Sequence, residues 1–111
     1  MQILLHPSAQ RQGNGSSDEY IEPDFKARSI LIRVTAISVN LLGSITFRLQ
    51  HSADGSDWLD VPNMLTGAIS ATGTTTLTVD PGFACFDHLR ISWTFNNANS
   101  VTFSGSALGT K

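Results

Sequence analysis

The sequence predicts an all-β protein, folded as a single-domain antiparallel β-sandwich of the jelly-roll type. Most segments alternate apolar and polar residues with a period of two, which is typical of half-buried strands. Turn signals interrupt these segments about every 8 to 12 residues, as they do in sandwiches. Serine and threonine supply 24 of the 111 residues, and long stretches of the residues that favour helix are absent.

Chain length and composition exclude several classes of protein. With 111 residues, 41% of them hydrophobic and 14% charged, the chain suits one compact domain with one core. The lone Cys85 excludes an internal disulfide and a multi-cysteine zinc site. A formal charge of -2 gives no electrostatic reason to bind nucleic acid or an anionic membrane. No apolar stretch approaches the roughly 20 residues of a membrane span, and no basic segment precedes the first apolar run, so we expect no signal peptide.

The N-terminal quarter reads as an appendage to the sandwich. Residues 2–5 are predicted to form a short edge strand, and residues 6–18 a polar loop or arm, since they contain Pro7 and are rich in Gln, Gly, Asn and Ser. Residues 19–22 form a further short strand that Pro23 closes. We therefore divide the chain into an N-terminal extended arm or edge segment, residues 1–27, and a β-sandwich domain, residues 28–111.

Two central strands are the clearest elements. Residues 28–37 and 45–51 each place their aliphatic residues on one face, with a turn at residues 40–43 between them. Asp54-Gly55 is a strong tight-turn signal, because glycine accepts the positive φ that such turns require. Residues 58–61 then form a short return strand.

The C-terminal third continues the pattern. Residues 62–73 read as a loop and a candidate contact surface, and residues 74–79 as a strand. Residues 88–95 show the cleanest alternation, and we expect them to pair as a hairpin with residues 101–104 across a polar asparagine loop. The predicted core comprises Ile30, Ile32, Val34, Ile45, Phe47, Leu49, Trp58, Val61, Leu77, Val79, Leu89, Ile91, Trp93, Val101 and Phe103.

The residues that bear reactive groups show no catalytic pattern. The three histidines do not converge with carboxylates in the sequence, and Cys85 has apolar neighbours that would raise its pKa if it were buried. Asp54, Asp57 and Asp60 recur every third residue, a spacing that does not fit an EF-hand, so a solvated turn is the simpler interpretation and an ion site the alternative. We expect no enzyme, no cofactor and no metal centre.

Aromatic residues leave a second alternative open. An exposed aromatic side chain on a sandwich face can stack on sugar rings, and Trp58 follows an aspartate-rich turn. Its spacing from apolar neighbours favours core packing. A carbohydrate-binding module would require Trp58 to be exposed with polar groups arranged around it.

The stretch from Ile45 to Val61, with the turn Gln50-His51-Ser52-Ala53-Asp54-Gly55-Ser56-Asp57-Trp58, resembles a group of small tailed-phage structural proteins. Leu31 to Ala36 precedes this stretch and His88 to Thr94 follows it, so the resemblance covers roughly residues 28–108. Members share a Gln-x-Ser-x-Asp-Gly-x-x-Trp turn, a late strand with an Arg two residues before an aliphatic one, and a terminal hairpin. In this chain the stretch from Gln50 to Trp58 has the same spacing throughout, with His51 between Gln50 and Ser52.

The resemblance implies a virion component, assembled in the host cytoplasm and located on the capsid surface. We expect a capsid decoration, or cement, protein that binds the major capsid protein as a homo-oligomer, with a trimer favoured. A tail or head-to-tail joining protein is the nearest alternative, and a carbohydrate-binding module the next. The expected capsid or subunit contacts lie in the arm and in the loop at 63–73: Gln10, Arg11, Asn14, Tyr20, Asn63, Met64 and Leu65.

Overall fold

The computed structural model describes all residues from Met1 to Lys111. It contains seven strands, and no helix that is long and apolar enough to cross a membrane. The strands are β1 (Gln2–Arg11), β2 (Gly15–Ser16), β3 (Tyr20–Ile21), β4 (Lys26–Ser52), β5 (Leu59–Leu65), β6 (Gly73–Thr78) and β7 (His88–Thr110). All pairings are antiparallel, so the predicted all-β fold is confirmed.

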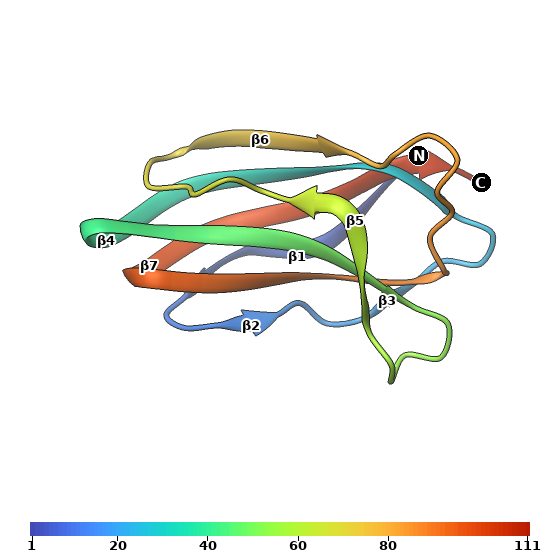
Figure 1. Ribbon diagram of the computed structural model, residues 1–111, viewed down its shortest axis with the longest axis horizontal. Helices are drawn as coiled ribbons and strands as arrows, with labels where there is room; N and C mark the ends of the chain where they lie inside the picture. The colour runs from blue at the N-terminus through green and yellow to red at the C-terminus, as the bar shows by residue number, and fades with distance from the viewer.

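The two long strands β4 and β7 form the frame of the molecule. They pair along almost their whole length, from Lys26 opposite Thr110 to Ser52 opposite His88. Both reverse direction at one end, β4 between Val39 and Ser44 and β7 around Asn97, which has a φ of 56°. Figure 1 shows this ribbon folding over at the left-hand end of the molecule.

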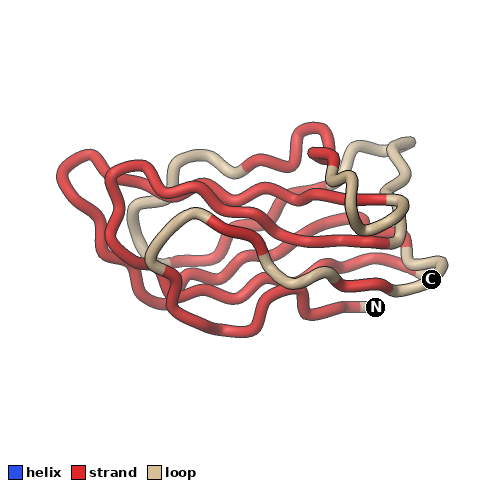
Figure 2. The backbone as a smooth tube through the Cα atoms, turned by 90° about the horizontal axis from the view of Figure 1, so that it is seen from below, coloured by secondary structure: helices blue, strands red, loops and turns tan.

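Because the ribbon folds over, one hydrogen-bonded sheet becomes two layers. The first layer has the order β1, β7 (residues 98–110), β4 (residues 26–39), β6. The second has β2 and β3, then β7 (residues 88–96), β4 (residues 44–52) and β5. This is a jelly-roll-like β-sandwich. Figure 2 shows loops at both ends of the strands, with further short loop stretches part-way along the molecule.

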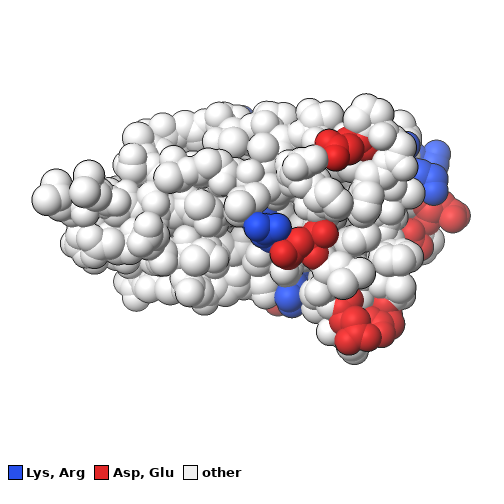
Figure 3. All heavy atoms as spheres, viewed as in Figure 1, with Lys and Arg blue, Asp and Glu red and all other residues white.

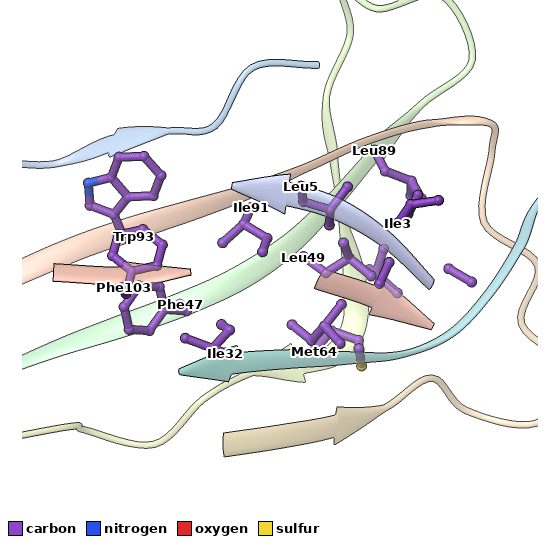
Figure 4. Packing of buried hydrophobic residues seen from close by; sticks show 14 of the residues in the cluster. Ile3, Leu5, Ile32, Phe47, Leu49, Met64, Leu89, Ile91, Trp93 and Phe103 are labelled. Atoms are coloured by element: carbon purple, nitrogen blue, oxygen red, sulfur yellow. The ribbon is translucent and has the colours of Figure 1, made fainter. Parts of the chain in front are cut away.

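The core lies between the layers and contains 19 buried hydrophobic residues. Phe103 from the first layer packs against Phe47 and Trp93 from the second, at ring-centroid distances of 4.7 and 5.1 Å (Figure 4). Of the 15 residues predicted for the core, 13 are buried. Leu77 is partly buried against the core, and Trp58 is half-buried on the outer face of the second layer, so the prediction for Trp58 was wrong.

The N-terminal residues form part of the sandwich, contrary to the predicted loop at 6–18. β1 pairs with β7 as far as Arg11, and its Ile3, Leu5 and His6 are buried. Two register shifts, between Leu4 and His6 and between His6 and Ala9, accommodate Pro7 in this edge strand. These irregularities break the alternation by which a strand is recognised from sequence.

Two further sequence predictions need correction. Residues 88–95 and 101–104 belong to the single strand β7 and lie in opposite layers; each pairs with β4, so they do not form a hairpin with each other. The predicted loop at 62–73 begins inside β5, where Asn63 has a φ of 61° and the register against β4 shifts. This bulge turns Met64 into the core, where it is fully buried.

Candidate functional site

One end of the molecule carries exposed apolar side chains at the point where β4 reverses. We call residues 40–43 and 96–99 the tip. Leu41 and Leu42 are 87% and 92% exposed, more than any other large hydrophobic residue. Leu42 also has a φ of 61°, a left-handed conformation that costs a branched residue about 1 to 2 kcal/mol. Exposure and strain together are unfavourable for the isolated molecule, so the tip is a candidate interaction site.

Asparagine side chains fix the shape of the tip. Asn40 Nδ2 donates to Asn97 Oδ1 at 3.1 Å, and Asn97 Nδ2 donates to the carbonyl oxygen of Leu41 at 3.0 Å. Asn99 Nδ2 donates to Asn40 Oδ1 at 3.3 Å. A Cβ at Gly43 would lie 2.2 Å from the carbonyl oxygen of Asn97, so only glycine allows the two strands to approach so closely. The leucines are thus presented on a cross-linked turn.

The charged residues are segregated along the long axis of the molecule. The connections at the tip end, residues 12–14, 40–43, 70–72 and 96–99, contain no charged residue. The connections at the other end, residues 17–25, 53–58 and 79–87, carry eight of the nine acidic residues: Asp18, Glu19, Glu22, Asp24, Asp54, Asp57, Asp80 and Asp87. Figure 3 shows the tip end without blue or red atoms on the face in view.

A cleft of about 250 Å³ opens at the sandwich edge between β1 and the segment that contains β3. It is lined by Leu4, Leu5, His6, Pro7, Arg11, Asp18, Glu19 and Tyr20. The Arg11 guanidinium lies 5.4 Å from the centroid of the Trp93 ring, and Arg11 Nε donates to His6 Nε2 at 3.1 Å. The cleft is therefore lined by one cation, Arg11, and two carboxylates, Asp18 and Glu19.

His6 is held in one neutral form by its partners. Its Nδ1 lies 3.3 Å from the carbonyl oxygen of Phe103, which can only accept, while its Nε2 accepts from Arg11. Burial lowers the pKa of His6 from its ordinary value of 6.5, and the positive charge of Arg11 lowers it further. The ring stacks on Phe103 at a centroid distance of 4.1 Å, so His6 acts as a core aromatic residue.

A row of bonded polar side chains crosses the outer face of the second layer. Arg48 Nη1 lies 3.2 Å from Asp60 Oδ2, and Gln50 Nε2 donates to Asp60 Oδ1 at 2.8 Å. Arg90 Nε donates to Gln50 Oε1 at 2.8 Å, and its guanidinium lies 4.3 Å from the centroid of the Trp58 ring. Trp58 is thus bordered by polar groups, but Arg90 covers one of its faces.

The aspartates of the 54–60 turn do not converge. Asp54 Oδ1 accepts from the backbone N–H of Ser56 and of Asp57, at 2.8 and 3.0 Å. These backbone hydrogen bonds lower the pKa of Asp54 to about 2. Asp60 is engaged by Gln50 and Arg48, and no three His, Cys, Asp or Glu side chains gather as metal ligands would. Asp54 therefore caps the turn.

His51 and Cys85 both lie toward the acidic end of the molecule, and burial shifts the pKa of each. The backbone N–H of Phe86 donates to His51 Nδ1 at 3.0 Å, and burial lowers the pKa of His51. Burial also raises the pKa of Cys85 to about 11. The Cys85 thiol is therefore protonated near neutral pH, a state that is poorly nucleophilic.

The predicted contact residues fall into separate places. Asn14 lies next to the tip, where its Oδ1 accepts from the N–H of Phe95 at 2.7 Å, and Gln10 is exposed on β1. Arg11 and Tyr20 line the cleft.

The remaining three predicted contact residues lie on β5. Asn63 donates to Asp80 Oδ2 at 2.8 Å, and Leu65 is 45% exposed at the end of the strand. Met64 is fully buried and has no surface to offer a partner, so that prediction was wrong. Sequence reasoning missed Leu41 and Leu42, although two adjacent leucines inside an Asn-to-Gly turn are a recognisable anomaly.

Comparison with known proteins establishes the fold. No family model and no curated protein matches the sequence. Among solved structures, the chain is similar to the SPBc2 prophage-derived protein YomS, with 12% identity, a TM-score of 0.51 and coverage of 96% of this chain and 90% of that one. It is equally similar to the low-affinity xylan-binding module CBM86 from Roseburia intestinalis, with 10% identity, a TM-score of 0.51 and coverage of 99% and 95%. PirA follows with 19% identity, a TM-score of 0.48 and coverage of 96% and 90%.

Proposed function

We propose that the protein is a structural component of a phage particle, and specifically a decoration protein that binds the major capsid protein on the outside of the head. The observation that carries the proposal is the uncharged tip, on which Leu41 and Leu42 are almost completely exposed. Interface centres are depleted of charged residues, and an exposed strained apolar turn is stabilised only when a partner covers it.

The uneven distribution of charge on the surface suggests how the protein is oriented on the capsid. With the tip directed at the capsid, the acidic end points to solvent, where its charges remain hydrated and keep particles apart. Asn14 and Ile69 lie beside the tip, because Asn14 bonds to Phe95 and Ile69 bridges to Ile45. Both flanking residues are uncharged, like the tip itself. The shared fold with a prophage-derived protein supports the same assignment.

The first test is the copy number of this chain in purified particles of the phage that encodes it, measured by quantitative mass spectrometry. A ratio to the major capsid protein near one, or a simple lattice fraction, is the expected result. A handful of copies per particle would assign the chain to the tail or the head-to-tail joining region instead. Absence from particles would refute the proposal.

The second test assigns the surface. Particles that lack the protein are mixed with purified variants, and bound protein is measured after sedimentation. We expect Leu41→Ser with Leu42→Ser to lose binding, whereas the control pair Ile21→Ser with Leu59→Ser should bind like the unaltered protein. The control leucine and isoleucine are 54% and 50% exposed and lie at the acidic end. Equal binding by both double variants would exclude the tip as the contact.

A second candidate function, carbohydrate binding, rests on the row of polar groups beside Trp58. Gln50, Asp60 and Arg90 are placed to bond sugar hydroxyls around a half-exposed indole, and the xylan-binding module has the same fold. The test is titration with soluble xylan while tryptophan fluorescence is recorded. Saturable quenching that Trp58→Ala abolishes would support this function, and an unchanged spectrum would exclude it for xylan.

A further inference from the structure

The sandwich has four strand edges, and three of them are interrupted. β1 contains Pro7 and two register shifts, and the edge made by β2 and β3 consists of two pieces of two residues each. β5 contains Pro62 and a register shift opposite Arg48 and Gln50. Prolines, bulges and short pieces are the features by which proteins stop an edge strand from pairing with another chain.

β6 is the exception. Its six residues, Gly73–Thr78, pair with residues 29–34 of β4 without any register shift. It contains no proline and no charged residue, and four of its residues are threonine, which favours strand. No strand pairs with its other side, and Figure 1 shows β6 along the upper margin of the molecule. This edge is open to pairing.

The phase of the ladder shows which backbone groups face outward. The N–H of Val79 donates to the carbonyl oxygen of Arg28 at 2.8 Å, so residues 79, 77, 75 and 73 direct their backbone groups toward β4. The N–H and C=O groups of Thr74, Thr76 and Thr78 therefore point away from β4. All three threonines are exposed, and no protein group bonds to their outward N–H or C=O.

We propose that this edge binds a second copy of the same chain, β6 to β6, antiparallel, about a two-fold axis at Thr76. The outward positions 74, 76 and 78 are symmetric about Thr76, so the N–H groups of each copy lie opposite C=O groups of the other. Thr76 then lies opposite its own counterpart and Thr74 opposite Thr78, which forms about six backbone hydrogen bonds. Threonine pairs across strands are favourable, and β6 brings no like charges together.

The pairing is independent of the proposed particle role, since it requires only the free protein. A single strand pair buries less surface than a standard protein interface. We therefore expect association at concentrations on the order of 100 µM rather than in the nanomolar range.

Disulfide trapping tests the register directly. In a Cys85→Ser background, Thr76→Cys places two cysteines on the axis with Cα atoms about 5.5 Å apart, a distance that a disulfide spans. In the Thr74→Cys dimer the two cysteines are offset by four residues along the paired strands, so their Cα atoms lie about 13 Å apart, which a disulfide cannot span. We expect Thr76→Cys to form covalent dimers under mild oxidation, and Thr74→Cys to form them only when mixed with Thr78→Cys.

Sedimentation velocity over a concentration series provides the non-covalent test. Thr76→Lys sets like charges opposite each other and should raise the dimer dissociation constant about tenfold. The control Thr94→Lys adds the same charge at an exposed threonine of the other layer and should leave it unchanged. A protein that remains monomeric at millimolar concentration, a dimer indifferent to Thr76→Lys, or equal trapping of Thr74→Cys and Thr76→Cys alone would each overturn the proposal.

Discussion

The adjacent residues Leu4 and Leu5 provide a matched pair that tests whether the N-terminal segment is a structural strand. Leu5 is 4% exposed and packs in the core, whereas Leu4 is 53% exposed on the same strand. Truncation of a buried leucine to alanine costs about 2 to 5 kcal/mol, from lost burial and from the cavity left behind. We expect Leu5→Ala to lower the free energy of unfolding by about 3 kcal/mol, because an edge strand relaxes partly around the cavity.

For Leu4→Ala we expect a loss below about 1 kcal/mol, since much of its surface stays in water in the folded state. Urea titration followed by tryptophan fluorescence measures both, because Trp93 is buried and reports on the core. The total stability of a domain of this size is about 5 to 15 kcal/mol, so the Leu5→Ala variant remains folded and measurable.

Equal and small losses for the two variants would refute this reasoning and restore the sequence-based hypothesis of an N-terminal arm or edge segment outside the sandwich domain. The structure also predicts that deletion of residues 1–18 unfolds or severely destabilises the protein, because it removes β1 and β2 with the buried Ile3, Leu5 and His6.

Three further predictions concern other parts of the sandwich. Trp93→Ala should cost about 3 to 5 kcal/mol and Trp58→Ala less than half of that, because Trp93 is buried and Trp58 is half-exposed; urea titration followed by circular dichroism measures both, since Trp93→Ala removes the fluorescent reporter. The pKa of His6 and of His51 is lowered in the folded state, so the unfolded chain binds more protons at acidic pH. Their contribution to stability should be constant above their ordinary pKa of 6.5 and be lost as pH decreases below it, and His6→Gln with His51→Gln should flatten that slope in thermal melts. Leu42→Gly should raise the free energy of unfolding by about 0.5 to 1 kcal/mol by relieving the strained φ; a lower melting temperature would contradict this.

Alternation along single strands predicted the frame of the fold correctly. Ile30, Ile32 and Val34, like Phe47 and Leu49, follow a strict period of two and are all buried. Such a pattern identifies a strand and its inward face without knowledge of its partners. It does not show that residues 88–95 and 101–104 lie in opposite layers. The chain reverses at Asn97 between the layers, and the sequence of this reversal looks like that of an ordinary polar hairpin loop.

The errors lie where the backbone departs from a regular ladder. His6 and Met64 are buried because bulges beside them change the side of the strand that faces inward. A bulge leaves no consistent mark in composition, and a histidine in a polar stretch looks like a surface residue. His6 can be buried because both of its ring nitrogens have hydrogen-bond partners. One partner is the carbonyl oxygen of Phe103, which is distant in sequence, and the other is Arg11 on the same strand.

The candidate site depends on a different kind of evidence from the core. Core residues are recognised because burial and periodicity agree, whereas Leu41 and Leu42 stand out because exposure and backbone strain both oppose what stability alone would select. Glycine at position 42 would relieve the backbone strain, and polar residues at positions 41 and 42 would be hydrated more favourably than leucine. The Asn40, Asn97 and Asn99 hydrogen bonds hold this turn in place. A turn that is both strained and fixed is the expected form of a contact whose stabilisation comes from a partner.

Leu42→Gly should therefore separate stability from particle binding, since this one substitution raises the free energy of unfolding and weakens binding. A variant that gained stability and bound particles as well as the unaltered protein would show that the strain serves no contact.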